Sequence, residues 1–134
     1  MTRSGGCRCG AVRYALAADP VATRLCWCRD CQYWATGNAA VNIVVPRAAV
    51  AVDGRLRSWD SRADSGHRMR RSFCGECGTQ LFSEALENTG FMVVRVGTLD
   101  DPGGIRPDTV IWTDSAPAWA RIDPALKAFP RQPG

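Results

Sequence analysis

Seven cysteines in three tight groups are the residues of this sequence with the clearest chemical potential. Along the chain they are Cys7 and Cys9, then Cys26, Cys28 and Cys31, and finally Cys74 and Cys77. An odd number of cysteines at such close spacing argues against a disulfide framework, and a Cys-x-Cys pair rarely closes a relaxed disulfide. The same spacing readily directs two or three thiolates at one metal ion. We therefore predict metal binding, with zinc as the ion that suits thiolate ligands.

The third group lies in the segment FCGECGT, residues 73–79, which is typical of a zinc knuckle. Two thiolates do not complete a structural tetrahedral zinc site, because such a site needs four ligands. Cys7 and Cys9, expected at the start of the first strand, are the obvious donors of the missing pair. With Cys74 and Cys77 they would form a closed site that joins the N-terminus to the middle of the chain.

The three remaining cysteines suggest a second zinc site of a different kind. If a helix begins near Cys28, then Cys28 and Cys31 share one of its faces, and Cys26 approaches from the preceding extended segment. Three protein ligands with one open position are typical of catalytic zinc, which can hold an incoming thiol as a nucleophilic thiolate. Alternatively, His67 or Asp30 supplies a fourth ligand and the site is a second structural one. A site with an open edge is also the one that could load only partly with zinc.

The elements that position these groups are expected to be mostly short strands. Apolar residues alternate at Val12, Tyr14 and Leu16, as a half-buried strand requires. By alternation and turn signals we predict strands over residues 10–16, 41–46, 56–59, 69–73, 80–83, 91–96 and 109–113. Residues 28–36, followed by Gly37, predict one or two helical turns. We expect a mainly β fold in a single domain over residues 1–134, with loose tails at 1–4 and 130–134.

Charge and hydropathy narrow the classes of partner. The formal net charge is +4, and seven thiolates with two zinc ions would bring it to about +1, so a nucleic-acid partner is not expected. The basic cluster of Arg68, Arg70 and Arg71 is interpreted as a solvated strand face. The longest apolar stretch, residues 39–45, is too short to span a bilayer, and no signal-peptide core follows the N-terminus. We expect a cytoplasmic protein, and its oligomeric state is left open.

Five segments together resemble one family. They are GGCRCGAVRY, CWCRDC, FCGECGTQLF, VGTLDDP and WTDSAPAWARID, and they extend over residues 5–129. The chain resembles the glutathione-dependent formaldehyde-activating enzyme family, which includes a centromere protein V-type relative. The resemblance implies an Mss4-like fold, a mostly β architecture held together by zinc. It also implies the partition reached above, with a structural site at the first and third cysteine groups and a catalytic site at the second.

The activity that the resemblance implies is the joining of glutathione and formaldehyde to give S-hydroxymethylglutathione, a carbon–sulfur lyase reaction. The thiol would bind at the open position of the second zinc, and its sulfur would attack the aldehyde carbon. Many members of the family have histidine where this chain has Trp27 and Val110. Without those imidazoles a proton donor for the adduct oxygen must come from elsewhere, and the only histidine here is His67.

Four further residues are candidates for substrate binding. Trp27 could form an apolar wall beside the metal, and Trp112 lies in the C-terminal motif. Arg29 could bind a glutathione carboxylate, and His67 could reach the site. Arg24 and Arg68 are alternative arginines for the same carboxylates. Two other functions stay open: a non-catalytic zinc scaffold that recognises a partner, and a redox-sensitive protein that releases zinc from the second cysteine group on oxidation.

Overall fold

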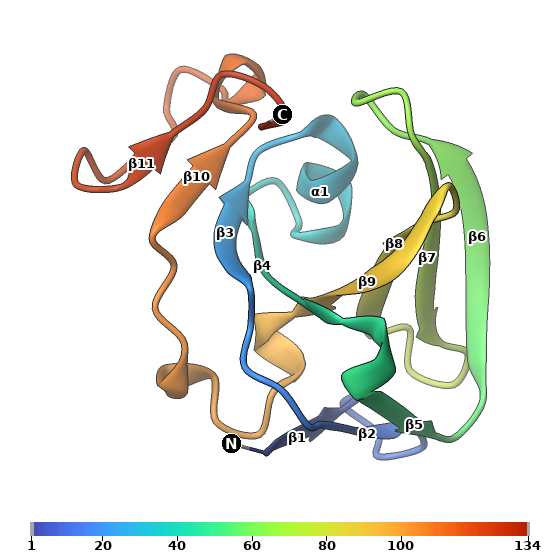
Figure 1. The fold of residues 1–134 in the computed structure, drawn as a ribbon. Coiled ribbons are helices and arrows are strands. Elements are labelled where there is room, and N and C mark those ends of the chain that lie inside the picture. The colour runs from blue at the N-terminus through green and yellow to red at the C-terminus, as the bar shows by residue number, and fades with distance from the viewer. Residues whose placement is uncertain (1, 134) are drawn as a thin grey trace.

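The computed structural model describes residues 2–133, and most of the regular structure in them is β-sheet (Figure 1). The strands are β1 (Arg3–Gly6), β2 (Arg13–Leu16), β3 (Ala22–Cys26), β4 (Ala40–Pro46), β5 (Val50–Asp53), β6 (Leu56–Arg62), β7 (Arg68–Cys74), β8 (Gln80–Ala85), β9 (Asn88–Arg95), β10 (Thr109–Ile111) and β11 (Lys127–Ala128). The helical elements are α1 (Arg29–Trp34) and the short 3-10 turns η1 (Arg47–Ala49), η2 (Val96–Thr98), η3 (Pro102–Gly104) and η4 (Thr113–Ser115). The predicted mainly β fold is confirmed.

The larger sheet has eight strands in the order β11-β10-β3-β4-β9-β8-β7-β6. Neighbouring strands within this sheet are antiparallel, except that β10 runs parallel to both β3 and β11. Figure 1 shows α1 between β3 and the β6–β7 hairpin. This arrangement brings the second cysteine group, at the end of β3, to face the inner side of the strands β7 to β9.

The smaller sheet, β1-β2-β5, packs its buried face into the main core. The alternation predicted for residues 10–16 is confirmed, because Val12 and Leu16 are fully buried and Tyr14 is nearly so. The Tyr14 hydroxyl lies 2.7 Å from Thr98 Oγ1, which itself donates to the Arg95 carbonyl at 2.7 Å. Since the single Thr98 proton is used there, Tyr14 must donate to Thr98. This chain of hydrogen bonds ties the small sheet to the end of β9.

The predicted helical segment at residues 28–36 is the single α-helix in residues 2–133. The Cys28 sulfur accepts a hydrogen bond from the Cys31 amide at 3.4 Å and so caps the first turn. The helix ends where Thr36 and Gly37 adopt positive φ values of 57° and 99°. The predicted glycine stop is therefore confirmed, because a left-handed residue after the last turn cannot continue a right-handed helix.

The loose tails expected at residues 1–4 and 130–134 are not found in the described residues at either end of the chain. Arg3 and Ser4 are not a loose tail, since they begin β1 and pair with β2. Residues 130–133 are also held, because Gln132 accepts a hydrogen bond from Trp112 Nε1 at 3.1 Å. Met1 and Gly134, the outermost residues of the predicted tails, lie outside the described residues. The single-domain organisation stays a prediction.

Two residue placements also differ from expectation. Cys7 and Cys9 lie in the turn between β1 and β2 rather than at the start of the first strand, because β1 itself was not foreseen. Arg71 is not solvated, since only 4% of its surface is exposed. Its guanidinium stacks over the Trp34 ring, 4.7 Å from the centroid, and donates to Asp30 and Ser61. In the residues that the structure describes, no helix is long and apolar enough to cross a bilayer.

Candidate metal centres and cavity

The first and third cysteine groups come together although 65 residues separate Cys9 from Cys74. The four sulfurs of Cys7, Cys9, Cys74 and Cys77 lie within 4.8 Å of one another. The sulfurs of Cys7 and Cys9 are 3.6 Å apart, and those of Cys9 and Cys74 are 3.8 Å apart. A tetrahedral zinc with bonds of about 2.3 Å separates its sulfurs by about 3.8 Å. The group therefore fits a four-thiolate metal site.

Two tight turns direct these sulfurs. In the β7–β8 turn, the Glu76 amide donates to the Cys74 sulfur at 3.3 Å, and the Gly78 amide donates to the Cys74 carbonyl at 2.9 Å. Gly78 has a φ of 78°, which residues with a Cβ adopt only at a cost. In the β1–β2 turn, the Val12 amide donates to the Cys7 sulfur at 3.2 Å. Backbone amides facing sulfur favour the charged thiolate, the form that ligates metal.

The second cysteine group forms a separate, buried trio. Cys26 ends β3, Cys28 caps α1, and Cys31 lies in the first turn of that helix. Their sulfurs lie within 4.8 Å of one another, so they too fit a metal site. Across residues 2–133, no histidine, aspartate or glutamate brings a fourth ligand atom within that distance of all three.

The two side chains considered as a fourth ligand lie elsewhere. Asp30 accepts a hydrogen bond from Arg71 Nη2 at 3.2 Å. His67 is exposed at the start of β7, and its amide lies 3.4 Å from Ser65 Oγ. The prediction of a site closed by either residue is not supported by this geometry.

The charge of the trio is balanced by a buried arginine. Arg95, only 8% exposed, directs Nη1 to the Cys31 sulfur at 3.8 Å and to Asn42 Oδ1 at 2.7 Å. Hydrogen bonds from Cys26 and Cys28, assisted by Arg95, lower the pKa of Cys31 to about 2. The neighbouring sulfurs of Cys28 and Cys31, followed by burial, raise the pKa of Cys26. The trio thus stabilises a thiolate even before a metal ion contributes.

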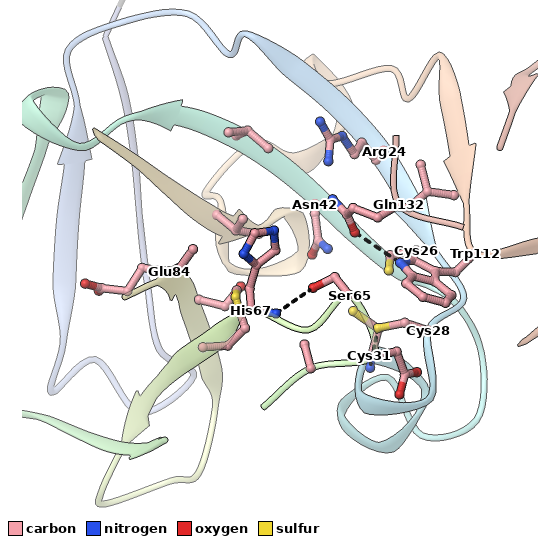
Figure 2. Close-up of a pocket in the computed structure, with 18 of the residues that line it drawn as sticks. Arg24, Cys26, Cys28, Cys31, Asn42, Ser65, His67, Glu84, Trp112 and Gln132 are labelled. Carbon is pink, nitrogen blue, oxygen red and sulfur yellow. Dashed lines mark hydrogen bonds between the residues drawn. The ribbon is translucent and has the colours of Figure 1, made fainter. Parts of the chain in front are cut away.

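The trio opens on a cavity of about 280 Å³. The lining residues come from β3, α1 and its cap, β4, β7, β8, β9 and β10, from the loop before β7, and from the C-terminal segment. Figure 2 shows the three sulfurs gathered beside Trp112, with Glu84 at the opposite end of the group. A cavity that joins buried thiolates to polar and apolar side chains is the typical form of a small-molecule site.

The structure divides the four predicted substrate-binding residues into two pairs. His67 and Trp112 line the cavity. Trp27 does not, because it is buried against Trp119 in an edge-to-face contact with ring centroids 6.2 Å apart. Arg29 does not either, since it is exposed on the outer side of α1 and lies over the Tyr33 ring. The expected roles of Trp27 as a wall beside the metal and of Arg29 as a carboxylate ligand are therefore not supported.

Other residues of the cavity were missed by sequence reasoning. Four lining residues were not considered: Asn42, Arg71, Arg95 and Gln132. Arg24 also lines the cavity, and the sequence analysis had named it. Asn42 interrupts the apolar run of β4, and Arg95 ends the apolar run of β9. A polar residue inside a buried strand is the signal that could have found both.

Comparison with known proteins agrees with these observations. A sequence model of the family described as glutathione-dependent formaldehyde-activating enzyme matches residues 2–115, which include all seven cysteines. A crystal structure of a Rhodobacter sphaeroides protein has a similar fold, with a TM-score of 0.58 and 22% sequence identity. The similarity covers 78% of this chain and 91% of that chain. The chain belongs to the glutathione-dependent formaldehyde-activating enzyme family.

Proposed function

We propose that this protein is a zinc-dependent enzyme that joins a small thiol such as glutathione to an aldehyde such as formaldehyde. The new bond is a carbon–sulfur bond, and the reaction takes place at Cys26, Cys28 and Cys31. The observation that carries the proposal is the buried trio of sulfurs that opens on a cavity with no fourth protein ligand among residues 2–133. Three protein ligands are the set found in catalytic zinc sites, whereas structural sites have four.

The residues of the cavity divide the chemistry among them. When bound, zinc supplies the Lewis acidity that keeps an incoming thiol in its thiolate form at neutral pH. Cys26, Cys28 and Cys31 hold the ion and, being buried, exclude water from its inner side. In the reaction the substrate sulfur gives an electron pair to the carbonyl carbon, and the carbonyl π pair moves to oxygen. That oxygen takes up one proton, which replaces the proton lost from the thiol.

Two side chains of the cavity have the chemistry that the rest of the reaction needs. Arg24 lines the cavity and makes no ion pair within residues 2–133, so its guanidinium is available to a substrate carboxylate. His67 is the only histidine of the chain and also lines the cavity. We assign its imidazole as the proton donor to the adduct oxygen. In many relatives histidines occupy the positions of Trp27 and Val110, and neither of these side chains can supply a proton as an imidazole does.

The four-cysteine site has a structural role in this proposal. Cys7, Cys9, Cys74 and Cys77 surround one position from four sides and leave no ligand place for a substrate. A zinc ion there would connect the β1–β2 turn to the β7–β8 turn. The protein would thus bind two zinc ions with different tasks.

The proposal is tested by metal content and by catalysis of hemithioacetal formation. Wild-type protein should contain two zinc ions and should speed the exchange between formaldehyde and its glutathione adduct, as followed by NMR. Cys28→Ser should contain one ion, keep its circular dichroism spectrum and lose the acceleration. His67→Gln, at an exposed position, should keep both ions and glutathione binding but react more slowly. Zinc-loaded wild-type protein that leaves the exchange at the uncatalysed rate would contradict the proposal.

A further inference from the structure

On β4 and β9, the side of the sheet that lines the cavity changes from polar to apolar with distance from the sulfur trio. Arg24, Asn42 and Arg95 face one another across β3, β4 and β9, and all three line the cavity. This polar row is two residues from the end of β3, where Cys26 lies. It is therefore the first row that a bound substrate meets beyond the sulfurs.

On β4 and β9 the next rows are apolar, while Ser83 of β8, which faces Val93, is polar. Val44 faces Val93 two residues farther along β4 and β9, and Phe91 follows two residues beyond Val93. On the adjoining strands, Met69 faces Ala85. These five residues line the same cavity as the cysteines. We call them the apolar strip.

The apolar strip is not part of the protein core. Val44, Val93, Met69 and Ala85 are only partly buried, and Phe91 is 43% exposed. Their neighbours on the opposite face, Ile43, Val45 and Val94, are completely buried. Because successive residues of a strand point to opposite faces, one face of β4 and β9 forms the core and the other forms the cavity wall. Apolar side chains left accessible in a cavity favour an apolar ligand group.

We propose that the apolar strip binds an apolar substituent on the aldehyde-derived carbon, so that the preferred electrophile is a longer aliphatic aldehyde. This proposal rests on the proposed function. Four residues along a strand separate the Cys26 row from the Val44–Val93 row, a distance of about 13 Å. A one-carbon aldehyde joined to a sulfur at the trio stays far short of that row. An alkyl chain of about six carbons extends about 8 Å from the sulfur and ends about 5 Å from the row, close to van der Waals contact with the valine side chains.

The thiol is the less suitable source of this apolar group. Glutathione has two carboxylates and an ammonium group, and moving charges onto an apolar wall carries a large desolvation cost. The polar row satisfies such charges instead, since Arg24 makes no ion pair in the described part of the chain. The aliphatic stems of the two arginines still allow an alkyl chain to pass.

The test measures binding without turnover, with the stable thioethers S-methylglutathione, S-butylglutathione and S-hexylglutathione as probes. Calorimetric titration of the zinc-loaded protein should give at least about tenfold tighter binding of the hexyl than of the methyl compound, the gain from burying two methylene groups. The variant Val44→Thr/Val93→Thr keeps the side-chain shapes and should remove this advantage while binding the methyl compound unchanged. Val52→Thr, on β5 outside the cavity, should keep it.

The outcomes separate this inference from the proposed function. Equal affinities for the three probes, or no binding of any, would overturn the role of the apolar strip. An advantage of the hexyl compound that survives Val44→Thr/Val93→Thr would overturn it as well. The formaldehyde exchange assay described above is independent of chain length. A protein that accelerates that exchange but binds all three probes equally would refute the proposed role of the apolar strip and leave the proposed function standing.

Discussion

Replacement of Arg95 should weaken metal binding at the trio and leave the four-cysteine site unchanged. Arg95 Nη1 lies 3.8 Å from the Cys31 sulfur, and only 8% of the residue is exposed. At that distance and an effective dielectric constant of about 20, the attraction between two unit charges is about 4 kcal/mol. Zinc itself neutralises part of the thiolate charge, so the effect on metal affinity is smaller. Residues that support metal ligands typically contribute a factor of about 10–100.

The informative change is Arg95→Met, because methionine keeps an unbranched apolar stem and removes the charged guanidinium. The assay is competition for zinc with a chromophoric chelator, in which the two sites of one molecule are titrated separately. We expect one zinc per protein to become about 10–100-fold easier to remove, while the other is released as in the wild type. Asn42 loses its hydrogen-bond donor in this variant, which should cost about 1 kcal/mol of unfolding free energy.

Two comparisons make the result decisive. Arg62→Met, an exposed arginine at the end of β6, should release both ions as the wild type does. Arg95→Lys should recover part of the affinity, since it restores the charge without the planar guanidinium. If Arg95→Met releases both zinc ions with wild-type affinity, the argument that this guanidinium stabilises the thiolates is refuted.

Three other predictions concern stability. Tyr14→Phe removes a buried hydrogen bond to Thr98, which should lower the unfolding free energy by about 1 kcal/mol and Tm by about 2–8 °C in a thermal melt. An unchanged Tm would contradict it. Cys77→Ser should prevent folding, as judged by circular dichroism, because structural zinc contributes about 10–16 kcal/mol against a typical total stability of about 5–15 kcal/mol. The hydrogen bond from Arg13, followed by that from Ser4, lowers the pKa of Asp100 to about 2. On acidification the Asp100 carboxylate is therefore protonated in the unfolded chain before it is protonated in the folded protein. Its contribution to the unfolding free energy is present above about pH 4 and is lost as the pH falls towards 2. Asp100→Asn should show a smaller fall of Tm over that interval, and a fall equal to that of the wild type would refute the assignment.

The sequence by itself was sufficient for features that depend on neighbours along the chain. The thiolate groups at Cys26–Cys31 and Cys74–Cys77 are defined by spacings of two and three residues, which a single turn determines. The alternation at Val12, Tyr14 and Leu16 predicted β2 because a strand has one buried face. The glycine stop after α1 likewise depends on a local φ value. The family could be recognised for the same reason, since its motifs are short and local.

Strand order was decided only by the tertiary structure, and with it the composition of the cavity. Arg24, Asn42 and Arg95 are 18 and 53 residues apart along the chain, yet they form one row because β3, β4 and β9 are neighbours in the sheet. Alternation tells which residues of a strand share a face but not which strand lies beside it. Trp27 and Trp112 looked equivalent for this reason, although one packs against Trp119 and the other lines the cavity. Contacts between distant segments are selected by burial of whole faces, which is a property of the assembled sheet.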